Sequence, residues 1–336
     1  MILTASIISF IGFGLFAVML AMLLAPIEAL GWWAGWYRRP RRYHHAYKGS
    51  LVASKASDHS HYVIYLDGIA KGSYKNFADV QTYLDGLKQA LPEISLIDVL
   101  PYSVTDIPLT RYRPMSRFWR FARERKLKND ADLLGFSINL SNLFQVFVSA
   151  DKRYGPLFNY GMAEKIIEAL LAEGYPVGSG KPITIIGYSG GGQIAAGVAP
   201  YLKHLLRAPV DLISLGGVIS ADPGLKDLRY IYHLSGDKDS VEKLGTLFFP
   251  GRWPLFQNSS WNYAKRKGKF TYIPIKQCKH NGAGGYLDEN CKLDSGDNNL
   301  ERTLELTLDI LCRPADIHAA REKRGPFNAL YARYLS

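Results

Sequence analysis

The stretch that most constrains how this chain can fold runs from Lys181 to Ala196. It opens with a β-branched run, residues 183–186, of the kind that forms a buried parallel strand, and a helical pattern begins at Gln193. Between them stands Gly187-Tyr-Ser189-Gly-Gly191, which is the G-x-S-x-G pattern of a nucleophile elbow. A side chain two residues to either side of the serine would collide with the strand or the helix. The segment therefore predicts a strand–turn–helix unit that presents Ser189.

The rest of the chain alternates strand and helix patterns in a way that predicts an α/β fold. Residues 61–69 predict a strand ending in a turn, residues 77–91 an amphipathic helix, and residues 96–100 a second strand. Strand, helix and strand with short connections form a βαβ unit, which implies a parallel sheet. Further elements are expected after this unit: helices over 161–173 and 300–311, and strands over 210–219, 230–234 and 270–275. We place the main domain at residues 61–314, with 315–336 as a C-terminal extension to which we assign no role.

Composition limits the classes of protein to which this chain can belong. Its 336 residues, 47% of them hydrophobic and 21% charged, suit one large globular domain with attachments rather than a disordered or fibrous chain. Three cysteines do not make a disulfide framework, and free thiols are favoured over a Cys278–Cys291 pair. The net charge of +11 predicts an anionic partner, either lipid headgroups or nucleic acid.

The first 37 residues predict a membrane anchor. No charged residue occurs from Ile2 to Ile27, and a helix over residues 2–24 would be roughly 35 Å long, enough to cross a bilayer. A belt of aromatic residues and then four arginines follow: Trp32, Trp33, Trp36, Tyr37, Arg38, Arg39, Arg41 and Arg42. A cleaved signal peptide would need a basic start and a shorter apolar core. We therefore expect a single-pass protein with a basic linker over 38–60 and its catalytic domain on the cytoplasmic side.

Residues 105–154 interrupt the strand–helix rhythm and predict a lid-like, membrane-facing insert. From residue 111 to 128 there are eight basic residues and one acid, interleaved with aromatic residues, and residues 133–150 carry no charge. A basic aromatic segment followed by an apolar one is typical of an element lying on anionic lipid. The alternative is a solvated basic helix followed by a core helix. No nucleic-acid-binding module is recognisable, so we expect no nucleic acid partner.

A serine becomes a strong nucleophile when a histidine takes its proton and an acid orients that histidine. Candidates follow the strands predicted after the elbow. Asp237 and Asp239 come after residues 230–234, and His280 comes after residues 270–275. Ligands bind at the carboxyl ends of strands in open α/β sheets, so these side chains are expected near Ser189.

With these features the chain resembles the α/β-hydrolase superfamily over residues 61–312. The resemblance implies Asp239, three residues after Gly236, as the acid and His280 as the base. It also implies an oxyanion hole formed by the N–H of Gly190 and that of Gly68 or Ile69. Asp222 and Asp237 remain alternative acids, and neither a cofactor nor a metal is expected. The chain departs from the family in having Asp67-Gly68-Ile69 in place of a His-Gly-rich run.

The resulting expectation is a membrane-anchored serine hydrolase that cleaves an ester, with a lipid or acyl ester as the substrate. The apolar, aromatic character of residues 105–154 and 248–256 favours such a substrate, although core packing explains aromatic residues equally well. Two alternatives stay open: an acyltransferase that uses the same three residues, and a catalytically silent membrane scaffold. The sequence leaves substrate identity and oligomeric state undetermined.

Overall fold

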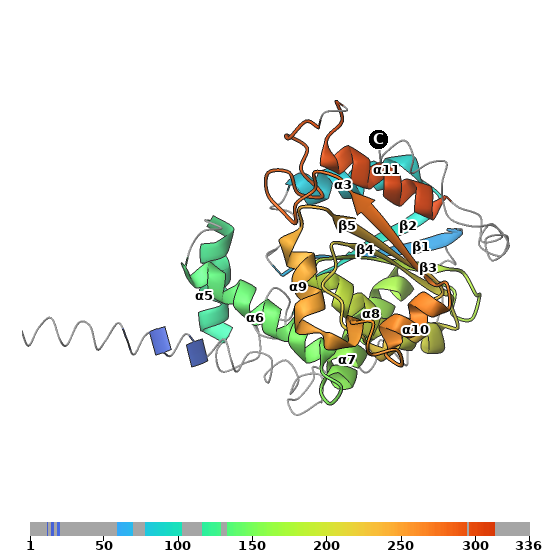
Figure 1. Ribbon diagram of the computed structural model, residues 1–336, viewed down its shortest axis with the longest axis horizontal. Helices are drawn as coiled ribbons and strands as arrows, with labels where there is room; N and C mark the ends of the chain where they lie inside the picture. Colours follow the sequence, from blue (N-terminus) through green and yellow to red (C-terminus); the bar gives the residue numbers. More distant parts are fainter. Residues whose placement is uncertain are drawn as a thin grey trace, which may run out of the picture.

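The structure is a computed structural model, and it describes residues 12, 15, 16, 19, 20, 59–69, 78–102, 116–128, 133–293 and 296–312. Its centre is a six-stranded parallel sheet in the order β2-β1-β3-β4-β5-β6 (Figure 1). The strands are β1 His61–Leu66, β2 Ile94–Val99, β3 Ile183–Tyr188, β4 Val210–Leu215, β5 Ile231–Gly236 and β6 Phe270–Ile275. Since β2 and β3 lie on opposite sides of β1, the strand order reverses there, and such reversals place ligand sites at the carboxyl ends of the strands.

Helices cover both faces of the sheet, as the strand pattern requires (Figure 1). Alternate residues of β1 point to opposite faces: Tyr62 and Ile64 enter one apolar core, whereas Val63 and Tyr65 enter the other. The first core is closed by α7 Gly155–Ala172, α8 Gly190–Leu206 and α10 Ser260–Arg266. The second is closed by α3 Ala78–Ala90 and α11 Asn299–Leu311. The predicted α/β fold with a parallel sheet is therefore confirmed.

Two predicted boundaries are wrong, and each has a local cause. The strand expected to reach residue 219 ends at Leu215, because Gly216 adopts a φ of 53° that turns the chain out of the sheet. The helix expected to begin at Gly161 begins at Gly155, where Pro156 occupies the first turn and supplies a backbone angle suited to a helix start.

The insert contributes two helices, α5 Ser116–Lys128 and α6 Leu133–Ala150. α6 packs on α5, α7 and α8, and α5 lies at the end of α6 that is farther from the sheet (Figure 1). α9, Ser240–Phe248, follows β5 and lies beside α6, where the rings of Phe147 and Phe248 are 5.9 Å apart. Residues 105–115 and 129–132, also assigned to the insert, lie outside the described residues.

The predicted anchor falls almost wholly outside the part of the chain that the structure describes. Five of its residues are described, namely Gly12, Leu15, Phe16, Met19 and Leu20, and these are helical and exposed. Among the described residues, no helix combines the length and the apolar character needed to cross a bilayer. The basic linker up to residue 58 and the C-terminal extension are likewise outside the described residues.

Candidate active site

Ser189 stands at the sharp turn between β3 and α8. Its backbone has φ 53° and ψ −121°, a strained combination for a residue with a side chain. The turn leaves no room for a larger residue at either flanking glycine. A methyl group on Gly187 would lie 2.7 Å from the Cα of Gly192, and one on Gly191 would strike the carbonyl oxygen of Leu66 in β1. The steric reason for the predicted elbow is therefore present in the structure.

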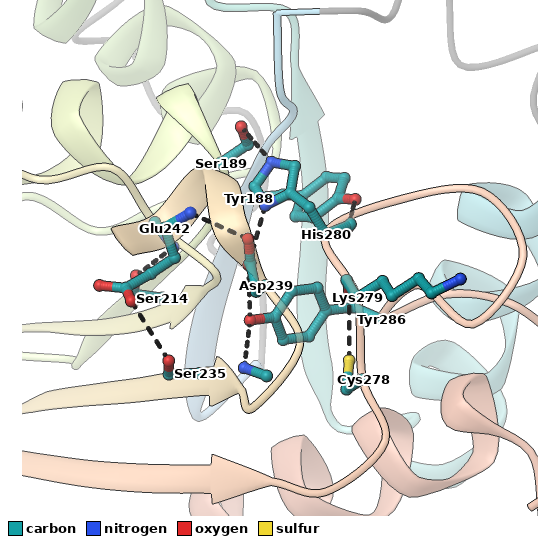
Figure 2. Close-up of polar contacts among 12 residues, drawn as sticks. Tyr188, Ser189, Ser214, Ser235, Asp239, Glu242, Cys278, Lys279, His280 and Tyr286 are labelled. Carbon is teal, nitrogen blue, oxygen red and sulfur yellow. Dashed lines mark hydrogen bonds and ion pairs between the residues drawn. The ribbon is translucent and has the colours of Figure 1, made fainter. Parts of the chain in front are cut away.

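Ser189, His280 and Asp239 form a continuous hydrogen-bonded line (Figure 2). His280 Nε2 lies 2.8 Å from Ser189 Oγ, and His280 Nδ1 lies 2.9 Å from Asp239 Oδ2. Since a carboxylate can only accept, Nδ1 carries the proton and Nε2 is left to accept the serine O–H. The three side chains follow β3, β5 and β6, and their residues are 6%, 0% and 9% exposed for Ser189, Asp239 and His280. The fold thus brings together the three residues predicted from the sequence.

Two tyrosines that were not predicted as site residues also contact Asp239 and His280. Tyr286 Oη donates to Asp239 Oδ2 at 2.9 Å and accepts the backbone N–H of Gly236 at 2.6 Å. Burial, together with the nearby Asp239 carboxylate, raises the pKa of Tyr286, so its phenol stays a neutral donor. Tyr188 donates to the carbonyl of His280, and its ring stacks on the imidazole at a centroid distance of 5.6 Å. No local pattern in the sequence marks either tyrosine.

A buried charged cluster lies behind Asp239 and holds the start of α9. The backbone N–H of Glu242 donates to Asp239 Oδ1 at 2.9 Å, so the acid is also the N-cap of α9. The Glu242 carboxylate accepts from Arg252 at 2.7 Å, from His233 Nε2 at 3.0 Å and from Ser235 at 3.3 Å. Figure 2 draws the Glu242 bonds to Asp239 and to Ser235.

Charge balance in this cluster follows from burial. Burial lowers the pKa of His233, so the ring is neutral at pH 7 and donates its Nε2–H. The charged partner of Glu242 is therefore Arg252. Burial alone would raise the pKa of Glu242, but the hydrogen bonds from His233 and Arg252, together with the charge of Arg252, outweigh burial and lower that pKa to about 2. His233 is a fully buried member of this cluster.

The other side of Ser189 carries the predicted oxyanion donors. Gly190 is the first residue of α8, and N–H groups in the first turn of a helix have no partner within it. Gly68 is adjacent, since a Cβ placed on it would lie 3.1 Å from that of Ser189, but its N–H already donates to Asp67 Oδ1 at 2.7 Å. Ile69 is therefore the better second donor. Its carbonyl accepts from Asn142 Nδ2 of α6 at 2.8 Å, which ties the insert to this loop.

Neither alternative acid reaches His280. Asp222 caps a short 3₁₀ helix, Pro223–Lys226, where its oxygens accept from Gln193 Nε2 and from the N–H of Gly224. Burial raises the pKa of Asp222. Asp237 is exposed, and its carboxylate accepts from the N–H of Cys278 at 3.3 Å. The hydrogen bonds of the site therefore single out Asp239.

The described part of the chain can also be compared with two other kinds of site, a metal centre and a reactive thiol. No group of three His, Cys, Asp or Glu side chains there could hold a metal ion. The three cysteines are free, as predicted, and burial raises the pKa of Cys278, which disfavours its thiolate.

No protein-family model matches this chain, and a search of curated proteins finds no match either. The fold and the site together define an α/β protein with a buried serine–histidine–aspartate line.

Proposed function

We propose that this protein is a serine hydrolase that cleaves an ester through Ser189, His280 and Asp239. The observation that carries the proposal is the continuous hydrogen-bonded line from Ser189 Oγ through both nitrogens of His280 to Asp239 Oδ2. A structural serine in a core would gain nothing from a strained backbone or from a histidine placed 2.8 Å from its oxygen. Such strain together with such a partner is typical of an activated nucleophile.

The reaction would proceed in two halves. Ser189 Oγ attacks the ester carbonyl as its proton passes to His280 Nε2, and the Asp239 carboxylate stabilises the imidazolium. The N–H groups of Gly190 and Ile69 receive the oxyanion, and such donors contribute roughly 3 kcal/mol each to transition-state stabilisation. The C–O bond to the alcohol then breaks and His280 protonates the leaving alkoxide. Water then attacks the acyl-serine while one of its protons passes to His280. The C–O bond to Ser189 breaks, the carboxylic acid leaves, and His280 returns that proton to Ser189 Oγ.

The proposal includes a lipid or lipid-like acyl ester as substrate and the membrane as the place of action. Its support is the uncharged run from Ile2 to Ile27 with arginines after it, and the basic residues of α5. In this arrangement residues 2–24 anchor the chain and the domain lies on the cytoplasmic side. A reporter enzyme fused after Ser336 should be active only in the cytoplasm, and activity on the other side would overturn that orientation.

The central test is labelling with a fluorophosphonate, which reacts with activated serines. The wild-type chain should form one adduct, on Ser189. We expect none with Ser189→Ala, and labelling slowed about 10⁴-fold or more with His280→Ala. Ser179→Ala, at an exposed serine, is the matched control and should label as the wild type does. A folded wild-type chain that takes no label, or an adduct that persists in Ser189→Ala, would sink the hydrolase proposal.

Product analysis distinguishes hydrolysis from acyl transfer, since only the attacking group of the second half-reaction differs. A lipid ester should release free acid whether or not an alcohol acceptor is added. A new ester formed at the expense of acid would assign acyl transfer instead. A chain that labels but turns over neither way would fit the catalytically silent scaffold.

A further inference from the structure

Two helices beside the candidate active site each bury polar side chains and expose apolar ones, although α6 also buries Ile138 and Val146. In α9 the buried residues are Glu242 and Gly245, while Leu244, Leu247 and Phe248 are 41%, 65% and 52% exposed. In α6 the buried face carries mostly hydroxyl and amide side chains: Ser137, Ser141, Asn142, Gln145 and Ser149. An amphipathic helix on a water-soluble domain normally does the reverse.

The inward polarity of both helices has a structural explanation. Glu242 turns inward to meet Arg252 and His233, and Asn142 turns inward to hold the carbonyl of Ile69. Ser149 donates to Asn159 of α7 at 2.7 Å. None of these contacts requires Leu or Phe on the outer faces. The outer residues therefore need an explanation of their own.

Exposed apolar residues of the two helices and of the segment after α9 make up what we call the α6–α9 face: Phe147, Leu244, Leu247, Phe248, Trp253 and Leu255. Phe147 of α6 packs edge-on against Phe248 of α9, and Trp253 Nε1 donates to the carbonyl of Thr246 in α9. Leu255 is 82% exposed. Exposed apolar surfaces of this kind are typical of sites that bind another protein or a membrane.

Charge around this face selects the kind of partner. α5 packs on α6 and exposes Arg117, Arg120 and Arg125 with a single acid, Glu124, and α9 exposes Lys243. Basic residues next to an apolar surface complement anionic headgroups above acyl chains. Trp253, with its apolar ring and its N–H donor, is of the type enriched at that boundary.

We infer that the α6–α9 face docks onto an anionic bilayer surface, with Leu247, Phe248 and Leu255 entering the acyl-chain region. This inference deepens the membrane part of the proposed function by assigning the surface through which the domain meets lipid. Because α6 also holds Ile69 through Asn142, the docked face lies one helix away from the oxyanion loop.

The experiment follows insertion residue by residue in the full chain reconstituted into vesicles. An environment-sensitive NBD fluorophore is attached at Leu247→Cys, after the exposed Cys291 and Cys312 have been replaced by serine. Val177→Cys is the matched control: Val177 is 47% exposed and precedes the amino-terminal end of β3, at the sheet edge opposite Ser189. Vesicles are phosphatidylcholine with and without phosphatidylserine, in each case with or without brominated acyl chains.

We expect a blue-shifted emission and quenching by brominated chains at position 247 and neither at position 177, with the larger effect when phosphatidylserine is present. A second variant, L244S/L247S/F248S labelled at Leu255→Cys, should lose at least about tenfold in quenching. Equal signals at 177 and 247, or no signal at 247, would overturn the inference. Shielding at 247 that grows with protein concentration in the absence of vesicles would assign the face to a protein partner and also overturn it.

The outcome is separable from that of the catalytic proposal because insertion needs no turnover. The same reconstituted samples are labelled with fluorophosphonate. Insertion at position 247 without an adduct on Ser189 would support the docking face and contradict the proposed enzymatic activity. An adduct without insertion would do the opposite.

Discussion

The two sides of Ser189 are built differently. On the acid–base side both oxygens of Asp239 are engaged, Oδ2 by His280 and Tyr286 and Oδ1 by the N–H of Glu242. On the proposed oxyanion side, Asn142 of α6 donates to the carbonyl of Ile69, and the same helix exposes Phe147. The proposed proton path is thus fixed by interactions within the core. The proposed oxyanion loop, by contrast, is bonded to a helix that forms part of the proposed membrane surface.

The number of hydrogen bonds on each side matches what each step of the proposed reaction requires. A proton relay loses efficiency with small displacements, so dense bonding around Asp239 favours it. A loop that must admit substrate gains from having fewer constraints. Three variants test this difference between the two sides of Ser189.

Asp239→Asn should cause the largest loss. The neutral amide cannot stabilise the imidazolium and can hold His280 in the wrong tautomer, so kcat should fall about 10⁴-fold. The measurement is steady-state hydrolysis of a soluble ester, with thermal unfolding to verify the fold. Asp237→Asn, two residues earlier and exposed, is the control and should stay within about twofold. Comparable losses in both variants would contradict the assignment of the acid.

Glu242→Gln tests the support behind Asp239 and should act mainly on stability. It leaves the buried Arg252 without its counter-charge, for which we expect about 3 kcal/mol less free energy of unfolding at pH 7. The folded-state pKa of Glu242 is lowered from 4.5 to about 2, so its stabilising effect is complete above 4.5 and is lost as the pH falls towards 2.

The free energies of unfolding of the wild type and Glu242→Gln should therefore converge as the pH is lowered through that interval. Urea unfolding at pH 7, 4 and 3 measures the gap, and Glu289→Gln at an exposed site is the control. A gap that stays constant with pH would mean that the ionised carboxylate is not what stabilises this cluster.

Asn142→Ala tests the oxyanion side and should have the smallest effect. Losing the hydrogen bond from Asn142 should displace the loop that carries the Ile69 N–H. Because this N–H would act on the charge that develops in the transition state, we expect kcat to fall about tenfold with little change in KM. Ser141→Ala is the matched control, because Ser141 Oγ is buried in the same helix with no hydrogen-bond partner among the described residues. A tenfold loss in Ser141→Ala, or a rise in KM alone in Asn142→Ala, would refute a positioning role for Asn142.

The elbow and the order of serine, acid and base were predictable from the sequence because each rests on local constraints. Gly187 and Gly191 are required by steric contacts within a few residues of the turn or on the adjoining strand. Asp239 and His280 could be selected because the ends of parallel strands must meet at one edge of the sheet. Choosing Asp239 over Asp237 needed only the resemblance to a family, and the hydrogen bonds agree with that choice.

The supporting residues could not be found in this way. Tyr286, Arg252 and Asn142 lie 47, 10 and 73 residues away from the residues that they contact, which are Asp239, Glu242 and Ile69 respectively. No periodicity or spacing encodes such pairs, because side-chain contacts across elements depend on how the helices pack. The same holds for α6, where the uncharged sequence concealed which face is buried.

The sequence alone predicts an α/β fold with a strained serine turn, and it predicts an acid and a base at the ends of later strands. Strand pattern, glycine sterics and chain order are local properties, so they can be read without coordinates. The tertiary structure was needed to show that Glu242 and Asn142 are buried, whereas Leu247 and Phe248 are exposed. The reason is physical: buried polar groups must find hydrogen-bond partners, and those partners belong to distant segments that meet only in the folded chain.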